Sequence, residues 1–499
     1  MRIGVLDLLA DSESRGCAER IYGHYFRRQF TSIMPQIVSV WCRQLGHDVH
    51  YRTFYGQKDP LSLLPADLDI VFISAYTQAS ALAYALSRIW RQRGTLTVLG
   101  GPHAKAFPQD CLRFFDIVVG ECDRNLIEDI LAYRVEVPSI AASDRAPTQL
   151  PTIEERLPEI ALANFDNGRP LLTSVIPVIA SLGCPYSCDF CTDWNTKYVA
   201  LDRDRLLEDL RYVATRHPRL HLLYHDPNFA VRFDEMMDII EQVPESCRNP
   251  YIMESSLSIL KPERLERLRR TNCVYIAPGV ESWADYSRKA GAGSKVGRDK
   301  LESVVAQFER LSAHVPGLQA NFILGADCDA GPEPVQLTKE FMRRLPFVFP
   351  TINIPTPYGG TPLYDRIRRE HRLLETMPFA FYYIPNLVIR LRGYHPIEYY
   401  RHLVELHELA SSMSMVAARL QAKGSVAIRM LSVLRTTGIK RDCRELRRIL
   451  GMLRTDREFR EFHEGRLQRL PAYYRYRLKR RLGRYGMLLS EADLTPVHV

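Results

Sequence analysis

The sequence predicts an α/β protein in which two parallel sheets follow one another and a mainly helical region comes last. Apolar runs typical of buried strands alternate with amphipathic stretches up to about residue 130. A second alternation covers about 171–375, and the pattern then becomes helical. The chain has 499 residues, 46% hydrophobic and 25% charged, so several globular domains are expected and a disordered chain is excluded.

The first alternation predicts a doubly wound sheet over residues 1–135. Strands are expected at 3–6, 70–73, 95–99 and 117–119, with helices at 33–45, 79–93 and 125–133. Ligands of such sheets bind where the strands end. Those ends carry Asp7 and a long loop, Tyr76-Thr77-Gln78, Gly100-Gly101-Pro102-His103, and Gly120-Glu121-Cys122-Asp123.

Two features bear on cellular location. Arg2 is followed at once by Asp7 and Asp11, which is unlike a secretory signal, so a cytoplasmic protein with reduced cysteines is expected. The uncharged stretch 70–87 has the minimum length of a membrane span. Polar residues interrupt it, and it is better divided into a strand, a loop and a helix.

A linker is expected at 136–170, where proline and acidic residues are frequent and periodicity is weak. The second alternation then predicts a partial (β/α)6 barrel over 171–375. Its strands are expected at 175–181, 221–225, 251–255, 274–279, 318–324 and 347–354, and its helices at 202–216, 233–241, 261–270, 295–311 and 334–344. Residues 376–499 are expected to be mainly helical.

Three cysteines stand at the end of the first barrel strand, in Gly183-Cys184-Pro185-Tyr186-Ser187-Cys188-Asp189-Phe190-Cys191. A C-x3-C-x2-C loop can bring three thiols to one metal centre. Structural zinc needs four ligands, and the nearest downstream candidates, His217 and His221, lack finger spacing. Three ligands on a four-iron cluster leave one iron open for a substrate or cosubstrate. The alternative is three core cysteines.

This loop, with Phe190 before its last cysteine, resembles the cluster-binding signature of the radical S-adenosylmethionine (SAM) superfamily. The resemblance implies a 4Fe-4S cluster on Cys184, Cys188 and Cys191. It also implies SAM bound at the open iron, reduction by a donor such as flavodoxin or ferredoxin, and cleavage to a 5′-deoxyadenosyl radical. Weaker matches after the second and fourth strands suggest SAM contacts at Asp226, Glu281 and Ser282, which could equally be capping or turn residues.

A doubly wound sheet ahead of such a barrel resembles the cobalamin-binding radical SAM enzymes. The resemblance implies that cobalamin lies at the strand ends, against Thr77, Gln78, Gly100, Gly101, His103, Gly120 and Glu121. Glycines there would let a large flat cofactor approach the backbone. The D-x-H-x-x-G stretch of many cobalamin proteins is absent after the first strand. The lower ligand of cobalt is therefore open: water, none, or a side chain of the loop 12–24.

The function implied is radical methylation of an unactivated carbon in a small molecule or lipid, with the catalytic positioning residues unknown. Ring formation, as in anaerobic tetrapyrrole cyclisation, is equally compatible with these residues. A tRNA methylthiotransferase would need a second cluster, for which Cys17, Cys42 and Cys111 are the candidates. A sensor without catalysis is the alternative from a different class.

The net charge of +9 is concentrated late in the chain. Residues 435–484 contain 17 Lys or Arg against 6 Asp or Glu, a surplus of 11 that leaves the rest of the chain at −2. A nucleic-acid partner is therefore not expected. Arg and Tyr interleaved at 466–485 indicate a solvated helix, with peripheral contact to an anionic membrane as the alternative. Phe379, Phe381, Tyr382 and Tyr383 could line a substrate pocket or simply pack outside the barrel.

Overall fold

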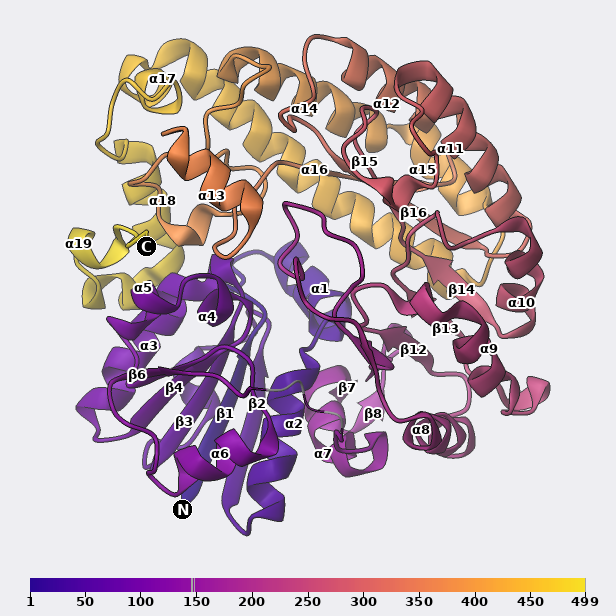
Figure 1. The fold of residues 1–499 in the computed structure, drawn as a ribbon. Coiled ribbons are helices and arrows are strands. Elements are labelled where there is room, and N and C mark those ends of the chain that lie inside the picture. Colours follow the sequence, from indigo (N-terminus) through magenta and orange to yellow (C-terminus); the bar gives the residue numbers. More distant parts are fainter. Residues whose placement is uncertain (145–146, 148, 499) are drawn as a thin grey trace.

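Two parallel sheets and a helical C-terminal region make up the fold (Figure 1). The computed structural model describes residues 1–144, 147 and 149–498. The N-terminal sheet, in indigo and purple, lies at the lower left, and the barrel curves around the right side from magenta to red. Orange and yellow C-terminal helices cross the top and return to the N-terminal domain.

The N-terminal sheet has six parallel strands in the order β2-β1-β3-β4-β5-β6. They are β1 (Arg2–Leu8), β2 (Asp48–Phe54), β3 (Ile70–Ala75), β4 (Leu96–Gly100), β5 (Ile117–Val119) and β6 (Ser139–Ala141). Alternate side chains of β1 enter different cores: Ile3 and Val5 pack with α2 (Ile33–Gln44) and α6 (Arg124–Leu131). Leu6 and Leu8 belong to the core that contains α3 (Ser80–Gln92) and α5 (Pro108–Leu112). Helices therefore cover both faces, and the predicted doubly wound sheet is confirmed.

Three elements of this domain differ from the expectation. Edge strand β2 and helix α1 (Cys17–Tyr25) were not predicted, and the latter lies in the stretch expected to be a loop. The prediction of an irregular linker at 136–170 is wrong, because this segment contains β6 and α7 (Ile153–Asn164). A capping box between Thr152 and Glu155 begins α7, which packs on α2. Residues 145, 146 and 148 of the predicted linker lie outside the described residues.

The stretch 70–87 folds as the sequence predicts, into β3, the 3-10 turn η3 (Thr77–Ala79) and the start of α3. Among the residues that the structure describes, no helix combines the length and the apolar character needed to cross a membrane. The short helix α4 (Pro102–Ala106) follows β4 directly.

The barrel sheet is also parallel, in the order β15-β16-β14-β13-β12-β9, with β17 beside β16. Its strands are β9 (Val175–Val178), β12 (His221–Tyr224), β13 (Tyr251–Met253), β14 (Cys273–Ile276), β15 (Gly279–Glu281), β16 (Gly317–Ile323) and β17 (Phe349–Asn353). Its helices are α8 (Arg203–Arg216), α9 (Phe233–Glu241), α10 (Leu265–Arg270), α11 (Gly297–Ser312), α12 (Glu333–Arg344) and α13 (Pro362–Arg369). The expected fourth strand is divided into β14 and β15, which both pair with β16. The predicted partial barrel is confirmed.

Two small hairpins lie outside these sheets: β7 (Phe165–Asp166) with β8 (Arg169–Pro170), and β10 (Ser181–Leu182) with β11 (Val199–Ala200). The second hairpin closes the base of the cysteine loop, since β10 precedes the three cysteines and β11 follows them.

The C-terminal region contains α14 (Pro396–Ala410), α15 (Met413–Gln421), α16 (Val426–Thr455), α17 (Arg457–His463), α18 (Ala472–Leu482) and α19 (Glu491–Leu494). The long helix α16 packs on α14 and passes α1, where a Cβ at Gly438 would lie 3.8 Å from the Tyr22 ring (Figure 1). The chain then returns to the N-terminal domain, where Arg88 and Asp493 form an ion pair at 2.7 Å. The C-terminal region therefore contacts both the N-terminal domain and the barrel.

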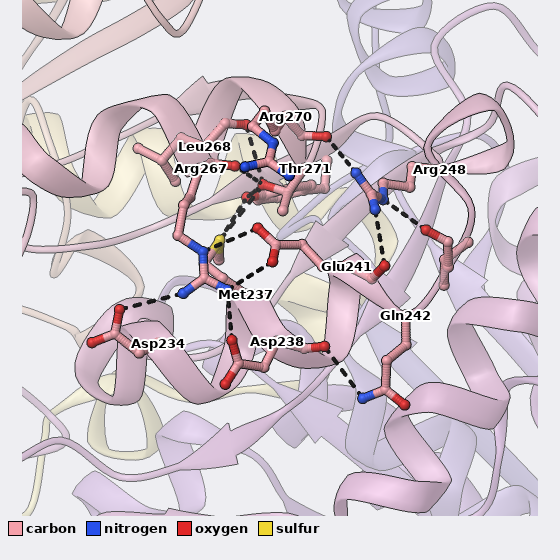
Figure 2. A network of polar contacts seen from close by, with 12 residues as sticks. Asp234, Met237, Asp238, Glu241, Gln242, Arg248, Arg267, Leu268, Arg270 and Thr271 are labelled. Carbon is pink, nitrogen blue, oxygen red and sulfur yellow. Dashed lines mark hydrogen bonds and ion pairs between the residues drawn. The ribbon is translucent and has the colours of Figure 1, made fainter.

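A polar network fixes two outer helices of the barrel (Figure 2). Arg267 on α10 donates to Asp238 at 2.6 Å and to Glu241 at 2.9 and 3.0 Å, both on α9. Arg248 donates to the Glu241 carbonyl at 2.9 Å. These carboxylates raise the pKa of the Arg267 guanidinium. One arginine thus joins two helices through several charge-assisted bonds.

We predict that Arg267→Met lowers the free energy of unfolding by about 1 kcal/mol, measured by chemical denaturation, because it removes a network rather than one exposed pair. Arg269→Met is the matched control. Among the described residues, Arg269 pairs with Glu266 alone, on the surface of the same helix, so no measurable change is expected. Equal effects of the two substitutions would contradict this assignment.

Candidate active site

The ends of β4 and β17 meet at the cysteine loop. A Cβ at Gly359, which follows β17, would lie 1.8 Å from the carbonyl oxygen of Ala106 in α4. Four residues further on, the Leu363 amide donates to the carbonyl of Asp189 within the loop at 2.9 Å. The Pro357–Tyr364 stretch therefore joins the N-terminal domain to the cysteine loop.

Charged groups of both domains also lie near the cysteine loop. Burial raises the pKa of Asp193, while Lys105 of the N-terminal domain and Lys289 of the barrel act to lower it. Lys105 in turn pairs with Glu121 at 2.7 Å. Asp193, two residues after the last cysteine, thus lies between the carboxyl edges of the two sheets.

The cysteine loop owes its shape to Gly183, whose φ is +68°. A Cβ at that position would lie 2.4 Å from the Lys197 carbonyl oxygen, so a larger residue does not fit. The Cys184 amide donates to Thr196 at 3.3 Å, and the Cys191 amide donates to the Cys188 carbonyl at 3.1 Å. These bonds turn the chain back on itself and bring the three cysteines together.

All three thiols lie near one lysine. Burial opposes the charge of Lys289, but Cys188, Cys191 and Cys184 raise its pKa overall. Among the described residues, no three His, Cys, Asp or Glu side chains are arranged to hold one metal ion. Three thiols on one short loop suit a four-iron cubane, because its corners bind separate ligands.

Aromatic and ionic contacts hold the outside of this loop. Phe190 stacks on Tyr286 with ring centroids 5.2 Å apart, and Arg366 of α13 donates to Asp189 at 2.8 Å. Phe190 is partly buried and packs against the main hydrophobic core. Its direct contact with SAM stays a prediction.

Asp226 is buried, and its carboxylate is already bonded within the protein. It accepts from the Ala180 amide at 3.1 Å and from the Ser181 hydroxyl at 2.5 Å, just before the cysteine loop. Burial raises the pKa of Asp226 to about 6, against these bonds. The geometry favours the alternative to a SAM contact: Asp226 positions the strand that carries the loop.

Ser282 is likewise engaged with protein. Its hydroxyl donates to Asp329 at 2.6 Å, and Asp329 accepts from the Gly325 amide at 3.0 Å. Lys300 donates to the Ser282 carbonyl at 2.5 Å. This network joins the ends of the fourth and fifth barrel strands and gives Ser282 a positioning role.

Glu281 keeps the properties of a functional group. Its backbone has φ of +64°, which costs a non-glycine residue about 1 kcal/mol. Burial raises the pKa of its carboxyl to about 7, while Lys289 and Lys300 act to lower it. Within the described residues its carboxylate accepts no hydrogen bond. An unpartnered acid beside Lys289 fits the predicted contact to a SAM amine.

The carboxyl edge of the N-terminal sheet is open at Gly100. A Cβ at Gly100 would meet nothing within 4 Å, and at Gly120 only Ala142, at 3.7 Å. Gly101 has φ of +88° and lies against Ser74 and Ala75, so the turn itself needs glycine. This edge has the room that a flat cofactor requires, and the predicted glycine contacts fit cobalamin.

The other predicted cobalamin residues lie differently. Thr77 is buried, Gln78 is half-buried and Glu121 is exposed at this edge. His103 is fully buried in α4, with Nε2 2.6 Å from the Tyr84 hydroxyl, and burial lowers its pKa to about 3. In this structure His103 faces the helices rather than the open edge, and its contact with cobalamin stays a prediction.

Sequence reasoning missed two charged residues of the interior. Glu254 directly follows β13, the place where barrel enzymes carry reacting groups, so that rule could have found it. The Glu254 side chain is accessible to solvent, but many protein atoms surround it. Desolvation raises the pKa of its carboxyl, while Lys289 and Arg435 act to lower that pKa. Lys289 has no sequence signal. A hollow of about 570 Å³ between α7 and α8 contains no predicted site residue.

Comparison with known proteins agrees with this site. Residues 178–327 match the Radical SAM superfamily. The bacteriochlorophyllide d C-12(1)-methyltransferase of Chlorobaculum tepidum is 22% identical over 71% of this chain and 77% of its own. The hopanoid C-3 methylase of Methylococcus capsulatus is 24% identical over 77% of each chain.

Two solved structures share the fold. The methyltransferase TsrM from Kitasatospora setae, with cobalamin and a [4Fe-4S] cluster bound, gives a TM-score of 0.56 at 12% identity, over 89% of this chain and 99% of TsrM. The cobalamin-dependent radical enzyme OxsB gives 0.55 at 13% identity, over 99% of this chain and 79% of OxsB.

Residues 178–327, which include the cysteine loop, thus form a Radical SAM domain. The chain resembles methyltransferases along most of its length and shares its fold with two enzymes solved with cobalamin bound.

We predict that Cys184→Ala, Cys188→Ala and Cys191→Ala each abolish the cluster. Anaerobically reconstituted wild type is expected to hold about four irons per chain, and each variant close to none. The matched control is Cys247→Ala, since Cys247 is an exposed cysteine outside the loop and should leave the iron content unchanged. About eight irons in wild type would indicate a second cluster.

Gly100→Leu is expected to weaken cobalamin binding at least tenfold, measured by absorbance of the retained cofactor, because the side chain would fill the open edge. The chain should fold normally, since nothing opposes a Cβ there. Gly100→Ala is the smaller control and should retain most binding. Unchanged affinity in Gly100→Leu would place cobalamin elsewhere.

Proposed function

We propose that this protein methylates an unactivated carbon of a small-molecule or lipid substrate. The observation that carries the proposal is the meeting of the cysteine loop with the open glycine edge, on either side of Asp193. Curated relatives that cover most of this chain are named as methyltransferases of bacteriochlorophyllide d and a methylase of hopanoids.

When bound, the cluster and SAM supply a carbon-centred radical for hydrogen abstraction, and cobalamin supplies the methyl group. The chain's own residues hold and enclose these groups. Cys184, Cys188 and Cys191 ligate the cluster, and Lys289 offsets their negative charge. Glu281 orients the SAM amine. The buried helices around the interior exclude water, which would otherwise quench reactive species.

Cyclisation is the second candidate, because an anaerobic magnesium-protoporphyrin IX monomethyl ester cyclase is 22% identical over 63% of the chain. The methylthiotransferase alternative loses support. Cys42 and Cys111 lie in separate cores on opposite faces of the N-terminal sheet, and Cys17 is exposed on α1. These three cysteines do not converge on a second cluster.

The remaining partners are part of the same proposal. An electron donor such as flavodoxin or ferredoxin would reduce the cluster, and the setting would be cytoplasmic. The structure of the basic C-terminal region gives little support to a contact with an anionic membrane. Several of its arginines pair with acids inside the protein, as in Arg481 with Asp11 at 2.7 Å and Arg477 with Glu445 at 2.6 Å.

Methylation is tested with SAM that carries a deuterated methyl group. Reduced enzyme with an extract of the source organism is expected to yield 5′-deoxyadenosine and a product with one labelled methyl group, detected by mass spectrometry. Cys184→Ala should yield neither, and Cys247→Ala should yield both. Formation of 5′-deoxyadenosine with an unlabelled, dehydrogenated product would favour cyclisation instead.

A further inference from the structure

A group of arginines surrounds two aromatic rings between the N-terminal domain and the barrel. Tyr22 and Phe26, at the end of α1, have ring centroids 4.9 Å apart. The guanidinium carbons of Arg27 and Arg441 lie 5.9 and 5.8 Å from the Tyr22 centroid, and that of Arg435 lies 5.9 Å from Phe26. Segments more than 400 residues apart thus bring three cations together.

Two of these cations lack a carboxylate partner. Arg441 pairs with Asp442 at 3.2 Å, and the neighbouring Arg481 pairs with Asp11 at 2.7 Å. In the described part of the chain, neither Arg27 nor Arg435 has an acidic group within ion-pair distance; Asp11 and Glu19 act on Arg27 only from further away. Two of its positive charges are therefore not joined to a carboxylate in an ion pair, although Asp11 and Glu19 partly offset that of Arg27.

Both arginines retain unused donors. Arg27 donates from its Nη1 to the Tyr55 carbonyl at 3.1 Å. Arg435 donates to the Tyr275 hydroxyl, and its guanidinium carbon lies 3.9 Å from the Phe349 ring centroid. A guanidinium has five N–H donors, so each side chain is held in place by one bond and can offer others to a ligand.

The surroundings make an anion favourable here. Burial lowers the pKa of Arg27, Asp11 acts to raise it, and the charge of Arg441 acts to lower it. Like charges on half-buried side chains are costly unless a counter-charge is bound. A carboxylate or phosphate bound at Arg27 and Arg435, beside the adjacent rings of Tyr22 and Phe26, would lower that cost.

The site also contacts the barrel that carries the cysteine loop, because Arg435 touches Tyr275 of β14 and Phe349 of β17. Arg435 acts on Glu254 at the end of β13, and so does Lys289, which lies beside the three thiols. A ligand held at the arginines would therefore extend toward the residues that hold the cluster.

We propose that Arg27 and Arg435 bind an oxyanion of the substrate, a carboxylate or a phosphate, and so orient its reacting carbon toward the cysteine loop. This inference rests on the proposed function. It narrows the substrate class to anionic molecules and disfavours a neutral hydrocarbon lipid.

The test uses the full chain reconstituted with cluster and cobalamin, so that cofactor phosphate sites are filled. Calorimetry measures binding of benzoate, benzamide and inorganic phosphate. Wild type is expected to bind benzoate or phosphate at least tenfold more tightly than benzamide. The anion that binds more tightly shows whether the substrate group is a carboxylate or a phosphate. Arg27→Gln and Arg435→Gln should each weaken that anion at least tenfold.

Arg444→Gln is the matched control, because Arg444 is an exposed arginine of the same helix and should bind the anion as wild type does. Arg27→Lys and Arg435→Lys keep the charge and should fall between wild type and the Gln variants. The proposal is overturned if wild type binds no anion, if the Gln variants bind normally, or if Arg444→Gln weakens binding equally. Loss of cobalamin with unchanged anion affinity would also overturn it.

Cleavage of SAM to 5′-deoxyadenosine, measured on the same preparations without substrate, separates this inference from the proposed function. Arg444→Gln, which lies outside the proposed site, should cleave SAM at the wild-type rate. Wild type that binds the anion but cannot cleave SAM would refute the function and leave the anion site standing.

Discussion

The site depends on one geometric constraint, which is that parallel strands leave only their ends free. Crossover helices cover both faces of the N-terminal sheet, and helices cover the outside of the barrel. Loops that can bind a ligand therefore collect at the carboxyl edges. The contact between Gly359 and Ala106 joins these two edges, so the cysteine loop and the Gly100 edge share one interior.

Desolvation governs what the charges in that interior can do. Burial raises the pKa of Asp7 to about 7, of Asp226 to about 6 and of Glu281 to about 7. Asp7 is held by the Ser32 amide at 2.9 Å, and Asp226 by the strand before the cysteine loop. Glu281 has no such bond in the described residues, and this contrast separates an acid free for a ligand from two that stabilise the fold.

Features formed by residues close together in the sequence could be predicted, whereas features formed by residues far apart in the chain could not. The three cysteines lie within eight residues, and the buried strands have continuous apolar runs, so both were visible. Strand β2 escaped because it reads Asp-Val-His-Tyr-Arg-Thr-Phe at the sheet edge, and α7 because proline and acids masked its capping box. Asp226 and Ser282 were identified by position, but position does not reveal that protein groups already occupy their hydrogen bonds. Glu254, Lys289 and Arg435 meet only after folding.

The positions of the basic residues in 435–484 show what many of them do in the structure. Its arginines do not form one exposed face: Arg441, Arg477 and Arg481 pair with Asp442, Glu445 and Asp11 near the interior. Asp11 follows β1, so the pair with Arg481 joins the C-terminal region to the first sheet. Arg435 lies on α16 and Arg481 on α18, so the C-terminal region supplies both the ionic closure of the interior and part of its positive charge. An anionic substrate would then stabilise the closed arrangement that excludes water from the radical chemistry.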